Sequence, residues 1–324
     1  MAKGSGTGRK KTTKAAATPA PAPLAVKSPS ASWFFRPRPL IVSAAVAMTI
    51  IAIPVLARRM PKLNERPEYR VSAAQISIST PPGWIPEDLA EQVFTRAGLE
   101  ENQSLLDATL SERVAAAFYT HPWVQDVRSV RKTFPARIHV DVVYREPVAM
   151  VKGVDGYYPI DRHGILLPAR DFSDADVEKF PMIERVASVP LGKLGEAWGD
   201  PAVSGAAELA AALIAKCDGK STWWNELELS AILMPRRVAL VEDADELEFG
   251  LRTRGGSEIL WGRAPGSRHP GELAVALKLQ RLSEYRRDFG SFDDAHGPYQ
   301  IDIRPWQGID RGFLAKDVRD TILQ

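Results

Sequence analysis

The longest uninterrupted hydrophobic stretch of the chain lies close to its N-terminus. Residues 39–57 (PLIVSAAVAMTIIAIPVLA) form a run of 19 positions without a charged side chain. As a helix this run would rise about 28 Å, which matches the hydrocarbon core of a bilayer. Aromatic residues 33–35 precede the run, and Arg58 and Arg59 close it, as is typical of membrane interfaces. The pattern predicts a single transmembrane helix at 39–57.

Two other structures are compatible with such a run: a buried helix of a soluble domain and the core of a cleaved signal peptide. A buried helix of this length bracketed by charged residues is uncommon. A signal peptide normally has a much shorter region before its apolar run, whereas 38 residues precede it here, and no convincing small-x-small cleavage site follows. An uncleaved membrane anchor is therefore the favoured interpretation.

A polar linker at 58–71 leads into a region, residues 72–149, in which strand and helix periods alternate. Apolar residues recur every second position around Ile76 and Ile78, and every third or fourth position in two later segments. Trp123 directly follows Pro122 at a strand start, and we expect its ring to be buried against the second helix. The predicted elements are a strand at 73–79, helices at 86–98 and 107–121, and strands at 123–130 and 137–145. This order is the layout of a POTRA module, a small sheet with two helices on one face.

Residues 150–324 read mainly as strands broken by turns, with helices inserted. Gly255-Gly256 marks a hairpin between two of the strands. Cys217, the only cysteine, falls on the apolar face of a predicted helix, so we expect it in the core. Leu314, Val318 and Ile322 are spaced as on one face of a C-terminal helix. The predicted elements are strands at 238–241, 247–253, 257–262 and 299–304, and helices at 201–217, 272–286 and from 314 onward. The sequence predicts a mostly antiparallel β domain with inserted and C-terminal helices.

The charge distribution orients the predicted membrane helix. Residues 1–38 hold eight Lys or Arg and no Asp or Glu, whereas the rest of the chain carries 34 basic and 40 acidic residues. Basic flanks lie on the cytoplasmic side, so we expect the N-terminus in the cytoplasm and the bulk of the chain outside it. Residues 12–32 are rich in Ala, Pro, Ser, Thr and Lys, which predicts that 1–38 is a disordered basic cytoplasmic tail. A contact of this tail with anionic lipid is the alternative; it lacks the interleaved aromatics that would favour nucleic acid.

Catalytic chemistry is not indicated by any motif. The five histidines show no metal-ligand spacing, and neither a glycine-rich phosphate loop nor a nucleophile motif is present. Asp161 and His163 stand two apart beside a glycine, where an aspartate commonly organises a turn. We therefore expect a protein that is not an enzyme, with no catalytic residues, no cofactor, no metal, no small-molecule substrate and no nucleic-acid partner.

Local phrases of the chain resemble the bacterial cell-division family FtsQ (DivIB). The segment HPWVQDVRSVRKTFPARIHVDVVYREPVAM at 121–150 and the segment GYYPIDRHGILLP at 156–168 carry most of this resemblance. A third phrase, Ile301-Asp302-Ile303-Arg304, is similar to the family's last strand. The chain departs from the family at Tyr144, where Glu is usual, and at Pro305, where Tyr is common. The matching landmarks are Pro122-Trp123-Val124, Val130, Phe134-Pro135, Arg145, Pro147-Val148-Ala149, and Tyr157 to Gly164.

The resemblance implies an α+β protein with a single transmembrane helix, a POTRA domain (β-α-α-β-β) and a β domain. It also implies a location in the cell inner membrane, with the bulk of the chain on the periplasmic side. It implies a non-enzymatic divisome scaffold, which links early and late cell-division proteins at the septum by protein–protein contacts. Its expected partners are divisome membrane proteins of the FtsB/FtsL type. The alternative is a POTRA-containing envelope transport or assembly factor, a class that usually shows several POTRA repeats and a long barrel.

The resemblance also points to a partner-binding segment near the C-terminus. We expect strand 299–304 to be an exposed edge, because unpaired backbone groups at an edge can pair with a strand of another chain. Pro305 lacks an N–H, so it cannot extend the ladder by donation. Trp306 can supply an aromatic anchor in its place. The candidate partner-binding residues are Tyr299, Gln300, Ile301, Asp302, Ile303, Arg304 and Trp306.

Overall fold

The computed structural model describes residues 37–59, 66–99, 103–235 and 244–314. The chain divides into two units, Met1–Pro61 and Lys62–Gln324, which are described separately. Three predictions lie outside the described residues: the conformation of the basic tail up to residue 36, the strand at 238–241, and the helix beyond residue 314.

The first unit contains one long helix, α1 (Pro37–Arg59), which covers the whole apolar run at 39–57. Pro54 lies inside the helix without ending it. From residue 41 to residue 56, where the side chains are described, all of them are exposed. Within the described residues, no helix is both long and apolar enough to cross a membrane. The helical conformation of this segment is confirmed, and its place in a membrane stays a prediction.

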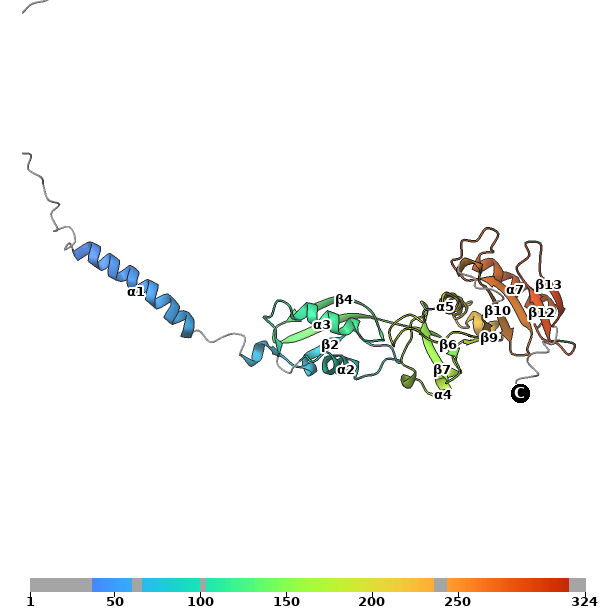
Figure 1. Cartoon of the computed structure of the whole chain (residues 1–324), viewed down its shortest axis with the longest axis horizontal. Coiled ribbons are helices and arrows are strands. Elements are labelled where there is room, and N and C mark those ends of the chain that lie inside the picture. Colours follow the sequence, from blue (N-terminus) through green and yellow to red (C-terminus); the bar gives the residue numbers. More distant parts are fainter. Residues whose placement is uncertain (1–36, 60–65, 100–102, 236–243, 315–324) are drawn as a thin grey trace, which may run out of the picture. The chain divides into compact units, whose positions relative to one another are not determined.

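The first part of the second unit follows the predicted order of strand, helix, helix, strand, strand (Figure 1). In the described chain, β2, β5 and β4 form a three-stranded sheet in that order, with β2 parallel and β4 antiparallel to β5. A short pair of strands, β1 and β3, was not predicted. The elements are η3 (Pro67–Tyr69), β1 (Arg70–Val71), η4 (Ala73–Gln75), β2 (Ile76–Ile78), α2 (Leu89–Arg96), β3 (Gln103–Ser104), α3 (Leu110–Tyr119), β4 (Val124–Thr133) and β5 (Arg137–Tyr144).

A first hydrophobic core lies between this small sheet and its two helices. Helix α2 buries Leu89 and Val93, one helical turn apart, and α3 buries Leu110 and Val114 in the same way. Trp123 is fully buried in this core, as predicted. Burial of each such side chain stabilises the fold by roughly 1.5–3 kcal/mol.

The second part of the unit is built on a larger sheet. Among the described strands its order is β13-β12-β11-β10-β9-β8-β6-β7. The elements are β6 (Pro147–Lys152), β7 (Tyr157–Asp161), η5 (Ala169–Asp171), α4 (Asp174–Val177), β8 (Met182–Glu184), α5 (Pro201–Leu213), α6 (Trp223–Glu226), β9 (Leu229–Leu233), η6 (Ala244–Glu246), β10 (Glu248–Thr253), β11 (Glu258–Arg263), α7 (Val275–Phe289), β12 (Tyr299–Asp302) and β13 (Asp310–Phe313).

Antiparallel pairings are the majority among the described strands, as expected, but the sheet is mixed, and its parallel pairings were not predicted. Strand β8 is parallel to both β6 and β9, and β12 is parallel to β11, while the other described neighbours are antiparallel. Parallel neighbours need a crossover, and the helices supply it: α5 and α6 lie between β8 and β9, and α7 lies between β11 and β12. The helices predicted as insertions are these crossovers. The predicted hairpin around Gly255-Gly256 is confirmed by the pairing of β10 with β11.

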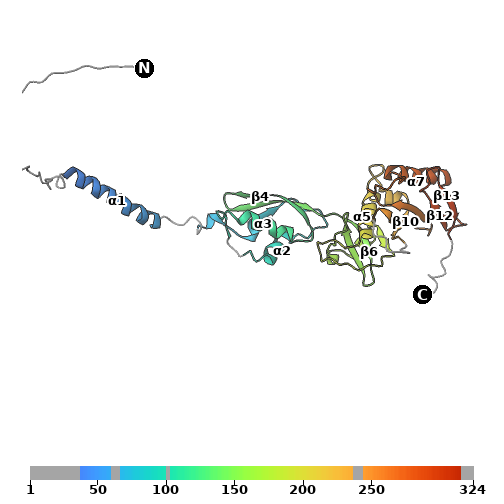
Figure 2. The same ribbon diagram turned by 45° about the horizontal axis from the view of Figure 1, so that its top comes forward.

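Helices α5 and α7 both pack into a second hydrophobic core. Leu209 and Leu213 of α5 and Leu282 of α7 join the strands there, and Figure 2 shows α7 beside β12 and β13, as Figure 1 does. Asp200 caps α5, because its carboxylate accepts a hydrogen bond from the Ala202 N–H at 2.9 Å. Helix α5 ends at Leu213, so Cys217 lies beyond the helix and is only half-buried, which corrects its predicted core position.

Side chains from the second part complete the first core. Leu167 is a member of the first core although it follows β7. The Trp123 indole donates a hydrogen bond to the Asp171 carboxylate at 2.8 Å and lies 5.8 Å from the ring of Phe172. The first core therefore depends on residues beyond 149, and the domain boundary expected between 149 and 150 stays a prediction.

Candidate partner-binding edge

Strand β12 contains the predicted binding segment, but it is not the edge of the sheet. On one side it runs parallel to β11, with Ile259 opposite Ile301. On its other side it pairs antiparallel with β13, with Gln300 opposite Gly312. Strand β13 is therefore the edge among the described strands, and the expectation that 299–304 is an exposed edge was wrong. The physical reason is that the chain turns back after Trp306 and satisfies the backbone groups of β12 itself.

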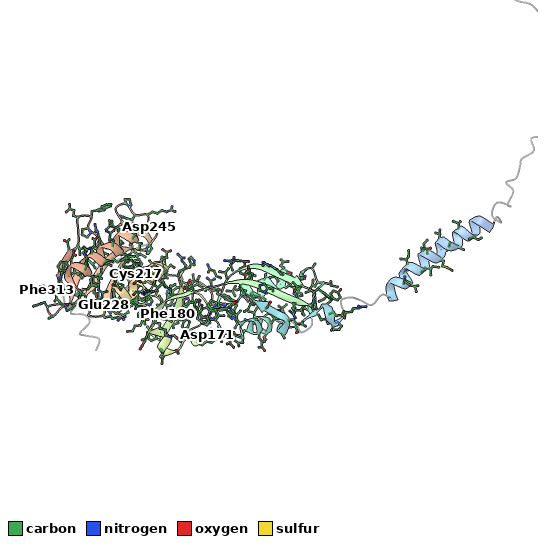
Figure 3. All side chains as sticks on the ribbon, turned by 180° about the vertical axis from the view of Figure 1, so that it is seen from behind. Asp171, Phe180, Cys217, Glu228, Asp245 and Phe313 are labelled. Carbon is green, nitrogen blue, oxygen red and sulfur yellow. The ribbon has the colours of Figure 1, made fainter. Side chains whose placement is uncertain are left out.

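Among the described residues, the backbone of β13 is paired on one side only. The Leu314 N–H donates to the Pro298 carbonyl at 3.1 Å, so residue 314 faces β12. Because backbone groups alternate in direction along an antiparallel strand, those of Arg311 and Phe313 face away from β12. All four residues of β13 are exposed, and Figure 3 shows Phe313 at the outer end of this sheet. This edge can accept a further strand.

The predicted binding residues separate into two sets by the direction of their side chains. Tyr299, Ile301 and Ile303 are buried in the second core. Gln300 is exposed, and Asp302 and Arg304 are half-buried. The alternation along the strand produces this division. The buried set anchors the strand in the core, and only the exposed and half-buried set can contact a partner through its side chains.

Arg304 organises the charges beside β12. Its guanidinium donates to Asp302 at 2.7 and 2.9 Å and also contacts Glu248 at the start of β10. Partial burial would raise the pKa of Asp302, but the hydrogen bonds and charge of Arg304 outweigh burial and hold that pKa below its usual value. The pKa of Arg304 is raised, first of all by its bond to Asp302. Both groups are ionised near neutral pH.

A second cluster attaches β13 to the sheet. The Arg311 guanidinium stacks 3.5 Å from the Tyr299 ring centre and pairs with Asp294 at 2.7 Å. Tyr299 donates its hydroxyl proton to Asp294 at 2.6 Å, which raises the pKa of Tyr299. The same bond, with those from the His296 N–H and Arg311, lowers the pKa of Asp294 strongly. Phe313 adds a stacked contact on Tyr299 at 5.5 Å.

Trp306 lies on a loop whose backbone is fixed by one arginine. Arg281 of α7 donates to the carbonyls of Ile303 at 3.0 Å, Pro305 at 2.6 Å and Trp306 at 2.8 Å. The Trp306 indole N–H donates to the Gly271 carbonyl at 3.2 Å, yet the residue is 68% exposed. A large aromatic ring is thus displayed on a held backbone, an arrangement that suits an interface anchor.

Sequence reasoning missed the residues that support this site. Arg281 donates hydrogen bonds to three carbonyls of a distant loop, and no pattern of residues in the sequence indicates such contacts. Strand β13 (DRGF) has no alternation of apolar and polar residues, because no side of it is buried. The only available signal was the apolar Phe313 shortly after Gly308, which is typical of a turn followed by a short strand.

The other candidate residues have structural roles. Asp161 accepts hydrogen bonds from the N–H groups of His163 at 2.8 Å and Ile165 at 3.0 Å. This confirms the interpretation of Asp161 as a turn organiser. Across the described ranges, no group of three or more His, Cys, Asp or Glu side chains is placed to hold a metal ion.

Within the described residues, these features define an α+β chain with an exposed sheet edge and a displayed aromatic ring. No family model matches the chain. The chain is similar to the curated "Cell division protein FtsQ" of Corynebacterium glutamicum, with 25% identity over 193 residues, which cover 59% of this chain and 72% of the relative. The resemblance to FtsQ that the sequence phrases indicated is thereby confirmed.

Proposed function

We propose that the chain is a non-enzymatic scaffold of cell division, which recruits other membrane proteins of the division machinery at the septum. Support comes from its similarity to a protein named "Cell division protein FtsQ". The expected partners are of the FtsB/FtsL type, as the family resemblance implies. The first part of the second unit would be its POTRA domain, with two helices on one side of a three-stranded sheet.

The open edge of β13 is the observation that carries this proposal. A strand of a partner pairs with the outward backbone groups of Arg311 and Phe313. The exposed rings of Phe313 and Trp306 act as anchors, since aromatic side chains dominate the binding energy of many interfaces. Gln300, Asp302 and Arg304 lie on the neighbouring strand and contribute side-chain contacts. Tyr299, Ile301 and Ile303 position this surface from the core.

Attachment to the inner membrane is part of the same proposal. The uncharged run at 39–57 lies within α1, and eight basic residues precede it. The chain is then a single-pass protein with a cytoplasmic N-terminus, and the binding edge lies outside the cytoplasm with its partners.

The test is a binding assay between the full-length chain in detergent and a candidate coiled-coil partner of the FtsB/FtsL type. Two variants at one position separate the ring from the backbone. Phe313→Ala removes the ring only, and Phe313→Pro removes the ring together with an outward N–H. We expect Phe313→Ala to weaken binding by about tenfold and Phe313→Pro by about another tenfold.

Phe134→Ala is the matched control, because that ring is similarly exposed but lies between β4 and β5. It should bind like the wild type. If both Phe313 variants also bind like the wild type, the interface lies elsewhere. If Phe313→Pro binds more tightly than Phe313→Ala, the partner displaces β13 instead of extending the sheet from it.

A further inference from the structure

A second surface, remote from β12 and β13, gathers positive charge around one hollow. The hollow has a volume of about 280 Å³ and is lined by Arg96, His121, Arg170 and Lys193, among other residues. The four come from different places in the chain: the end of α2, the turn after α3, η5, and the loop before α5. No acidic side chain is among its lining residues. Cations from separate elements of the fold therefore converge on one hollow.

Two of the three cations have no ion-pair partner within the part of the chain that the structure describes. Arg96 and Lys193 form no ion pair with any other residue that the structure describes. Arg170 lies 3.5 Å from Asp171, but that carboxylate also accepts the hydrogen bond of the Trp123 indole at 2.8 Å. Asp171, which is labelled in Figure 3, follows Arg170 in the sequence and is not among the residues that line this hollow. The residues that line the hollow therefore carry a net positive charge, while Asp88 and Asp171 line an adjoining hollow together with Arg96 and Arg170.

His121 adds a buried donor to this charge. Only 4% of the residue is exposed, although it lines the hollow. Its Nδ1 accepts a hydrogen bond from the Trp123 N–H at 3.3 Å, so in the neutral ring the proton resides on Nε2. Nε2 has no hydrogen-bond partner among the described residues. Burial is the main cause that lowers the pKa of His121 to about 4; the charges of Arg96 and Arg170 lower this pKa further, whereas those of Asp171 and Asp88 oppose them, so the ring is neutral at pH 7.5.

We propose that this hollow binds an oxyanion carrying two negative charges, either a dicarboxylate or a phosphate. Arg96 and Lys193 supply the charge, with Arg170 at the rim, and the His121 Nε2–H supplies a directed hydrogen bond. Guanidinium groups pair with carboxylates and phosphates through two parallel N–H bonds, so both sources of the anion fit the same donors. This site is independent of the β13 edge and of the proposed scaffold function.

The experiment follows the imidazole signals of the full-length chain in detergent, labelled with ¹³C and ¹⁵N at histidine. The chain has five histidines, so His121 can be assigned by substitution. Inorganic phosphate and succinate are titrated separately at pH 7.5, with sodium chloride adjusted to a constant ionic strength. We expect a saturable shift of the His121 signals with a midpoint in the low-millimolar range, and no shift of the other four. The titration that saturates, with phosphate or with succinate, identifies which class of anion binds.

Variants decide whether the cations form a site. Arg96→Gln and Lys193→Gln should each weaken the midpoint by roughly tenfold, as expected for the loss of a charge-assisted hydrogen bond. Arg268→Gln and Lys220→Gln are the matched controls, since both are exposed cations away from the hollow, and they should leave the midpoint unchanged. The proposal is overturned if neither anion shifts His121, or if all four variants respond like the wild type. Unchanged signals of the other histidines verify that each variant is folded.

Discussion

Arg145 and Asp161 form an ion pair at 2.8 Å, with side chains only 16% and 4% exposed. Arg145 follows β5 of the first core, and Asp161 ends β7 of the larger sheet. The same carboxylate also holds the turn at His163 and Ile165. One buried ion pair therefore joins the two cores and fixes a turn. Its loss should destabilise the contact between the cores and the turn.

Arg145→Met should destabilise the protein by about 3 kcal/mol, because it leaves a buried carboxylate without its counter-charge. The measurement is urea denaturation of the full-length chain in detergent. Arg113→Met is the matched control, since the Arg113–Asp107 pair is 43% and 35% exposed and should contribute less than about 1 kcal/mol. Equal effects of the two variants would show that the Arg145–Asp161 pair is not buried in solution.

Trp123→Phe tests the contact between the first core and η5. The variant keeps an aromatic ring but removes the N–H that donates to Asp171, so we expect a loss of about 1–2 kcal/mol. Trp123→Ala should cost about 3–5 kcal/mol, as is usual for truncation of a buried aromatic. Thermal denaturation of the full-length chain measures both. A fragment that ends at residue 150 is unsuitable, since it lacks Asp171 and Phe172.

The elements with a strong period could be predicted from the sequence. Helices α2, α3, α5 and α7 and the β10–β11 hairpin were found because one face of each is apolar, and burial of that face forms the element. Helix α7 begins three residues later than predicted, at Val275, because the chain before it is still extended at Ala274. Whether neighbouring strands are parallel or antiparallel could not be predicted, because a crossover helix and an inserted helix have the same local pattern of apolar residues.

The candidate edge was placed one strand too far inward. The alternation in Tyr299, Ile301 and Ile303 correctly indicated a strand with one buried side. Alternation reports which side faces the core, but it does not report whether another strand lies alongside. Strand β13 forms through backbone hydrogen bonds and the Arg311 cluster, which no period reveals. The same limit applies to the hollow at His121, which only the fold assembles.

The pKa of His121 predicts a dependence of stability on pH. Its folded value of about 4 lies below the ordinary 6.5, first because of burial and then because of Arg96. The unfolded chain therefore takes up the proton first, and stability falls as pH decreases from about 6.5 to about 4, by roughly 1–3 kcal/mol. His121→Gln should remove this part of the slope. Urea midpoints at pH 7.5 and 4.5 measure it, and identical slopes in both proteins would contradict the assignment.

The proposed topology predicts the behaviour of reporter fusions. A reporter that is active only outside the cytoplasm, fused after Gln324, should be active, because eight basic residues before α1 retain the N-terminus inside. A cytoplasmic reporter at the same position is the control and should be silent. The reverse result would show the opposite orientation. Activity of the cytoplasmic reporter together with a soluble protein would show that α1 does not anchor the chain.

Arg281→Met tests whether a held loop is needed to display Trp306. The substitution removes the donors to three carbonyls while keeping an apolar side chain of similar length. Because these carbonyls are partly solvent-accessible, we expect a loss of stability of only about 1–2 kcal/mol, but faster amide hydrogen exchange in residues 303–309. Binding of the FtsB/FtsL-type partner should weaken by about tenfold, since the ring must then be ordered on binding.

Arg287→Met, on an exposed part of the same helix, should change neither exchange nor binding. If Arg281→Met speeds exchange and leaves binding unchanged, Trp306 is not an anchor; if exchange is also unchanged, Arg281 does not hold the loop.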